Sequence, residues 1–164
     1  MNELIGLFIE DEPKNVRAYT DFFALEGLKV ECLDKLLPTV DGYYDIVLKR
    51  NIDFLIIDFH LDKEVTYKGI DVLKEIRKYD STIYAILLTN YNIDDSMGPF
   101  SNYDYELKKS EFTSRYKDVA EKIKRACSLR KENLMYATMK TQQEKDDKTI
   151  RLLQEISSKL DEKK

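Results

Sequence analysis

The stretch FLIIDFHL, residues 54–61, contains a short apolar run that stops at an aspartate, Asp58. An unbroken apolar run of this length is typical of a strand that is buried on both faces of a parallel sheet. We therefore predict a strand over residues 52–57 that ends at Asp58. Other apolar runs occupy residues 4–9, 28–33 and 83–88, and a weaker one occupies residues 103–109.

Stretches of helical period separate these runs. They cover residues 14–26, 40–50 and 69–78, and the pattern is helical again from Thr113 onward. Residues 91–103 contain Gly98-Pro99 and look too irregular for a good helix. Strands that alternate with helices imply right-handed crossovers and a parallel sheet. The sequence therefore predicts an α/β fold with a doubly wound, five-stranded parallel sheet.

Composition limits the function classes. The 164 residues are 43% apolar, enough for one sizeable core, and the net charge of −4 argues against a nucleic-acid binder. No apolar run approaches the ~20 residues that span a bilayer, and no secretory signal is evident. Two cysteines, Cys32 and Cys127, are too few for a disulfide framework. We expect a reduced, cytoplasmic protein without membrane or direct nucleic-acid partners.

Polar side chains gather where the predicted strands end. These are the acids Glu10, Asp11 and Glu12 after the first strand, Asp58 after the third, Thr89 after the fourth, and Lys108 and Lys109 after the fifth. In a doubly wound sheet these carboxyl ends share one edge, where ligands bind. Clustered carboxylates repel one another unless a cation is present, and hard oxygen ligands suit Mg²⁺. The lysine and the threonine would complete a cradle for phosphoryl oxygens.

Five segments together resemble a bacterial response-regulator receiver domain over about residues 1–128. They are FIEDEP (8–13), FLIIDFHL (54–61), GIDVLKEIR (69–77), ILLTN (86–90) and ELKKSEF (106–112). The resemblance implies a flavodoxin-like receiver fold, with a helical extension over residues 129–164.

The resemblance also implies roles for the polar residues at the strand ends. Asp58 would accept a phosphoryl group from a histidine kinase or phosphotransfer protein. Mg²⁺ would be bound by Asp11 and Asp58, by Glu10 mainly through water, and by the backbone carbonyl of His60. Thr89 would bond a phosphoryl oxygen, and Tyr105 would be the switch aromatic.

Two adjacent residues are candidates for the site lysine. Lys109 precedes Ser110, as in many receivers, whereas Lys108 better keeps the spacing from Tyr105; we favour Lys109. The segment from Asp58 to Gly69 is longer than in the family, and Asp62 replaces a common proline. Where the family usually has a small residue after the threonine, this chain has Asn90.

The C-terminal residues predict a solvated helix. Residues 138–164 hold seven basic and six acidic side chains, and heptad-like apolar spacing is broken by the polar stretch 142–148. We favour a helix that extends the predicted fifth receiver helix, residues 115–129, and that forms a homodimer through a coiled coil. A partly disordered tail is the alternative.

The main hypothesis is therefore a stand-alone, phospho-accepting switch that signals to an unknown downstream protein and has no separate catalytic domain. A phosphorylation-independent adaptor or dimerisation scaffold is the rival. An aspartyl-phosphate hydrolase would need an acid two residues after the nucleophile, where this chain has His60.

Overall fold

The computed structural model describes residues 3–61, 63–90 and 103–161. The chain divides into two compact units, Met1–Cys127 and Ser128–Lys164, which we call the N-terminal unit and the extension.

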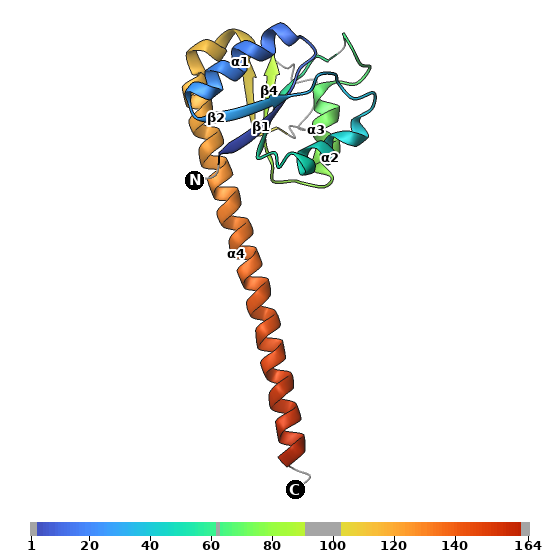
Figure 1. Ribbon diagram of the computed structural model, residues 1–164, viewed down its shortest axis with the longest axis vertical. Helices are drawn as coiled ribbons and strands as arrows, with labels where there is room; N and C mark the ends of the chain where they lie inside the picture. Colours follow the sequence, from blue (N-terminus) through green and yellow to red (C-terminus); the bar gives the residue numbers. More distant parts are fainter. Residues whose placement is uncertain (1–2, 62, 91–102, 162–164) are drawn as a thin grey trace. The chain divides into compact units, whose positions relative to one another are not determined.

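A single parallel sheet forms the centre of the N-terminal unit (Figure 1). Its five strands stand in the order β2-β1-β3-β4-β5. They are β1 (Leu4–Ile9), β2 (Leu28–Cys32), β3 (Phe54–Asp58), β4 (Tyr84–Thr89) and β5 (Tyr105–Lys108). Strand β2 lies on one side of β1, and the later strands follow one another on the other side. The carboxyl ends of β1 and β3 therefore form the topological switch point at which such sheets bind ligands.

Helices cover both faces of this sheet. Figure 1 shows α1 (Pro13–Leu25) on one side and α2 (Tyr43–Lys49) and α3 (Gly69–Arg77) on the other. The start of α4 (Phe112–Asp161) packs on the same face as α1, where Phe112 makes edge contacts with the rings of Tyr19 and Phe23.

The apolar core has two halves, one on each face of the sheet. Strand β3 contributes to both, because Leu55 and Ile57 join the half under α2 and α3 while Phe54 and Ile56 join the half under α1 and α4. All five residues of β3 are buried. This explains why the strand reads as an unbroken apolar run, and it fixes the position of the aspartate at its end.

The predicted α/β fold and the long C-terminal helix are confirmed, with shifts at the element boundaries. The third strand begins at Phe54 rather than residue 52, because Asn51 takes a left-handed φ of 52° and Asp53 bonds the start of β1 through the N–H of Ile5. The helix predicted over residues 40–50 is divided into a 3-10 turn, Val40–Gly42, and α2. The predictions for residues 91–103 and for Asp62 fall almost wholly outside the described residues.

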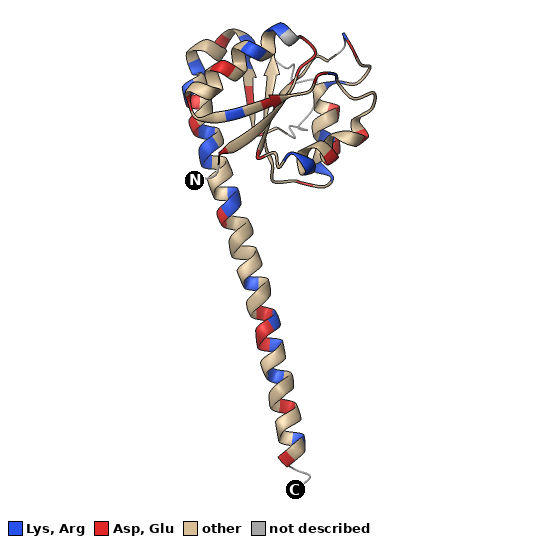
Figure 2. Cartoon of the chain, viewed as in Figure 1, with Lys and Arg blue, Asp and Glu red and all other residues tan. Residues whose placement is uncertain are grey.

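In the extension, α4 is helical from Ser128 to Asp161. Its described side chains are nearly all exposed, and basic and acidic residues alternate along it (Figure 2). It also exposes apolar side chains, which are Leu129, Leu134, Met135, Tyr136, Met139, Ile150, Leu152, Leu153, Ile156 and Leu160. No helix in the described part of the chain combines the length and apolar character needed to cross a membrane.

Candidate phosphoryl-acceptor site

Three carboxylates meet at the carboxyl edge of the sheet. Strands β1 and β3 pair in parallel, with Ile9 opposite Ile57, so the residues that follow them lie side by side. Oxygens of Glu10, Asp11 and Asp58 all lie within 4.8 Å of one another, and the three residues are only 7%, 8% and 2% exposed. We call these residues the acid triad.

Lys109 supplies the positive charge within this cluster. Its Nζ lies 2.6 Å from Asp58 Oδ2 and 3.1 Å from Glu10 Oε2, in a 3-10 turn (Lys109–Glu111) directly after β5. Lys108, the alternative site lysine, is the last residue of β5 and stands opposite Thr89 in the sheet register. The turn after β5 therefore brings the ammonium of Lys109 to Asp58.

Backbone donors hold two of the acids in place. Oε1 of Glu10 accepts hydrogen bonds from the N–H groups of Asp11 and Glu12, each at 3.1 Å. Oδ1 of Asp58 accepts one from the N–H of His60 at 3.3 Å. The carboxylates of Glu10 and Asp58 are thus oriented before any ligand binds.

Burial alters the protonation of this cluster. Desolvation, a hydrogen bond to Asp11 and the charge of Asp58 together raise the pKa of Glu10 to about 8. Burial by itself would lower the pKa of Lys109, but the hydrogen bond and charge of Asp58 outweigh it, and the pKa is raised. Burial and the neighbouring acids therefore favour the protonated form of Glu10, and a bound cation would favour the ionised form.

Gly69 gives the site its backbone geometry. The N–H of this first residue of α3 donates to the carbonyl of Phe59, and a Cβ atom here would overlap the carbonyl oxygen of Asp58. Helix α3 can approach the end of β3 so closely only with glycine at this position.

Thr89 ends β4, next to β3 in the sheet. It is 2% exposed, and its Oγ1 is buried without a hydrogen-bond partner among the residues that the structure describes. An unpaired buried hydroxyl is unfavourable, so this group is suited to an incoming ligand oxygen.

A cavity of about 370 Å³ opens onto part of this cluster. Its lining includes Asp11, Asp58 and Lys109, together with Glu12, Asn15, Tyr19, His60, Lys63 and Asn90. Sequence reasoning missed Asn15, Tyr19 and Lys63 as pocket residues. The first two have the helical spacing of α1, which predicts burial but not which end of the sheet a side chain reaches, and Lys63 lies in the unusual segment before α3.

Tyr105, predicted as the switch aromatic, is not among the residues that line this cavity. It begins β5, and its hydroxyl accepts a hydrogen bond from Arg115 of α4. The guanidinium of Arg115 and the ammonium of Lys122 lie 5.4 and 5.5 Å from the centre of its ring. Tyr105 is therefore held toward α4.

The donor set of the acid triad fits a hard divalent cation. Carboxylate oxygens with open positions suit Mg²⁺, which keeps water or phosphate oxygens as its other ligands. Glu12 is not a member of the triad. Its carboxylate accepts a hydrogen bond from Asn15 and pairs with Lys63. His60 lines the cavity, and its carbonyl as a cation ligand stays a prediction.

The fold places these groups in a known structural class. Similar structures include the response regulator protein TrrA from Thermotoga maritima, in complex with Mg²⁺-BeF, at 22% identity and a TM-score of 0.61 over 73% of this chain and 98% of that chain. The chain has the receiver fold. A response regulator receiver domain from Clostridium thermocellum matches at 22% identity and a TM-score of 0.62, over 80% of this chain and 98% of that one.

A third similar structure is the signal receiver domain of a putative LuxO repressor protein from Vibrio parahaemolyticus. It matches at 21% identity and a TM-score of 0.62, over 82% of this chain and 98% of that one. No protein-family model and no curated protein matches the sequence. The likeness therefore lies in the fold and covers nearly the whole of each of these receiver domains.

Proposed function

We propose that the chain is a phospho-accepting receiver switch, in which Asp58 takes a phosphoryl group from a histidine kinase or phosphotransfer protein. The observation that carries the proposal is the position of the Asp58 carboxylate, buried between two acids and the ammonium of Lys109. The Mg²⁺-BeF complex of the Thermotoga protein supports it, because that receiver binds a divalent cation together with BeF.

The chemistry follows from the residues present. An oxygen of Asp58 attacks phosphorus, the bond from phosphorus to the donor's imidazole nitrogen breaks, and that nitrogen takes up a proton. Mg²⁺ bound by the acid triad would neutralise charge on the transferring group. Lys109 would stabilise the same charge, and the hydroxyl of Thr89 would donate to a phosphoryl oxygen.

Mass spectrometry of the intact protein tests this proposal. Incubation with Mg²⁺ and a small phosphodonor such as acetyl phosphate should add one phosphate-sized mass. The Asp58→Asn variant should add none, whereas Asp45→Asn, at an exposed position of α2, should behave as the wild type. An adduct that survives Asp58→Asn would contradict the proposal.

We infer further that the extension transmits the signal through protein contacts. We propose that one of these contacts is pairing with the extension of a second copy of the chain. The support is its row of exposed apolar residues on a helix with both signs of charge. A polar helix of this length is not stabilised by propensity alone, so a partner helix would stabilise it. The same surface also suits the rival function, a scaffold that assembles whether or not Asp58 is phosphorylated.

Light scattering distinguishes the two functions. A switch should change its molar mass or its partner binding when phosphodonor is added, and Asp58→Asn should lose this response. A scaffold should show the same assembly in both proteins and under both conditions.

A further inference from the structure

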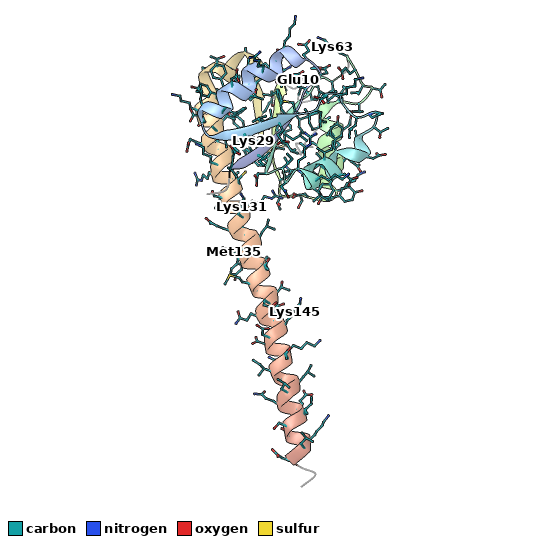
Figure 3. The ribbon with its side chains drawn as sticks, in the orientation of Figure 1. Glu10, Lys29, Lys63, Lys131, Met135 and Lys145 are labelled. Carbon is teal, nitrogen blue, oxygen red and sulfur yellow. The ribbon has the colours of Figure 1, made fainter. Side chains whose placement is uncertain are left out.

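The loop between β3 and α3 contains Lys63, which contacts two of the acids that follow β1. The backbone N–H of Lys63 donates to Asp11 Oδ2 at 3.2 Å, and its ammonium pairs with the carboxylate of Glu12. Figure 3 labels Lys63 and Glu10 at the same end of the N-terminal unit, and Lys63 lines the cavity that contains Asp58. One residue therefore engages both acids that follow Glu10.

The other end of this loop is fixed by a closed ring of hydrogen bonds. Tyr67 donates its hydroxyl proton to the carbonyl of Leu37 at 2.6 Å, and the N–H of Leu37 donates to the hydroxyl oxygen of Tyr43. The hydroxyl oxygens of Tyr43 and Tyr67 lie 2.6 Å apart. Because the hydroxyl proton of Tyr67 is used in the bond to Leu37, Tyr43 is the donor between them. Each donor and acceptor in the ring is used once, which ties the loop to the segment after β2.

The contact with Lys63 opposes a divalent cation in two ways. The backbone N–H of Lys63 already occupies one lone pair of Asp11 Oδ2, which leaves fewer positions on that oxygen for a cation. The ammonium of Lys63 pairs with Glu12, the residue after Asp11, and Lys63 lines the cavity that contains Asp58, so its positive charge repels a cation that enters this cavity. Both effects depend on the position of the loop, whose other end is tied by Tyr67 to the segment after β2.

We propose that Lys63 sets the divalent-cation affinity of the acid triad, acting as a competing internal cation that the Tyr67 anchor holds in place. The inference rests on the proposed function only in that the triad must bind the cation. It makes Lys63 a residue that decides at which Mg²⁺ concentration Asp58 becomes competent for phosphoryl transfer.

Mn²⁺ binding, followed by the electron paramagnetic resonance signal of the free ion, tests the proposal without any phosphorylation step. Mn²⁺ takes the same oxygen ligands as Mg²⁺. We expect Lys63→Ala to raise the affinity about three- to tenfold at low ionic strength, and added salt to shrink the difference. Lys63→Arg should keep the wild-type affinity. Tyr67→Phe, which removes an anchor but no charge, should raise the affinity in the same direction.

Lys35→Ala is the matched control. Lys35 is an exposed lysine that lines a second cavity beside Glu10 and Asp11, and its removal should change the affinity less than twofold. Equal effects of Lys35→Ala and Lys63→Ala, or no effect of Lys63→Ala on a wild type that binds Mn²⁺, would overturn the proposal. A wild type that binds no Mn²⁺, or an Asp11→Asn variant that binds it as well, would instead overturn the cation site itself and this proposal with it.

Discussion

The ammonium of Lys109 lies 2.6 Å from the Asp58 carboxylate, although the two residues are 51 positions apart in the chain. The same ammonium reaches Glu10 at 3.1 Å, so one lysine joins the ends of three parts of the sequence. This arrangement neutralises part of the negative charge at the site.

Lys109→Ala should slow phosphoryl transfer from a small donor by about 100-fold, because one positioned donor to the transferring oxygens is lost. Lys108→Ala should leave the rate within about threefold of wild type, since Lys108 belongs to β5 and lies opposite Thr89. The rate of mass increase with acetyl phosphate measures both. The reverse pattern would assign the site lysine to Lys108.

Cation binding should depend on pH through Glu10. Its pKa is raised to about 8, so below that pH a cation must displace a proton, and the affinity for Mg²⁺ should rise by up to tenfold per pH unit between about pH 6 and 8. Glu10→Gln should flatten this dependence. Titrations with Mg²⁺ followed by tyrosine fluorescence provide the measurement, because Tyr19 lines the cavity.

Stability without a cation should show the opposite trend. A carboxyl group with a raised pKa binds its proton more tightly in the folded chain, so its contribution is fully present below the ordinary value of 4.5 and is lost as the pH rises toward 8. The wild type in EDTA should therefore lose more stability between pH 6 and 8 than Glu10→Gln does. Urea unfolding at the two pH values would show it, and equal losses in both proteins would contradict it.

Gly69→Ala should destabilise the protein by about 1–3 kcal/mol or more, because its Cβ would overlap the carbonyl oxygen of Asp58. Gly27→Ala provides a useful contrast. Gly27 has open space around it but a φ of +73°, so its cost should be conformational and about 1 kcal/mol. Only Gly69→Ala should also slow phosphorylation of Asp58, since only that change displaces the acceptor.

Thr89→Val should leave the stability of the unphosphorylated protein unchanged or slightly higher, because no described residue bonds the Thr89 hydroxyl. The same change should weaken the response to phosphorylation, which the hydroxyl would otherwise stabilise. Thermal unfolding and light scattering with phosphodonor give the two readouts. A loss of more than about 1 kcal/mol before phosphorylation would show that the hydroxyl already has a partner.

Association through the extension should depend on its apolar residues. Replacing Leu153 and Ile156, which are 61% and 55% exposed, by glutamate should lower the molar mass measured by light scattering. The control places glutamate at Gln154 and Ser158, two exposed polar positions of the same helix. If both pairs of changes have the same effect, added charge rather than lost apolar contact is responsible.

The sequence alone determined the fold class and the candidates at the carboxyl edge. Apolar runs such as residues 54–58 are unbroken because both faces of the strand are buried, and this local signal predicts a parallel sheet. The rule that parallel strands present their carboxyl ends at one edge then brought Glu10, Asp11, Asp58 and Thr89 into one hypothesis without any contact being known.

The tertiary structure decided what depends on direction and on distant neighbours. Lys109 and Lys108 are adjacent in sequence, and only the turn after β5 brings one of them to Asp58. The raised pKa of Glu10 and the unpaired hydroxyl of Thr89 arise from burial by other elements, which no local pattern encodes. Lys63 lies in a loop without periodicity. Its contact with Asp11 joins residues 52 positions apart in the chain, and Tyr67 of the same loop is bonded to Leu37, 30 positions away.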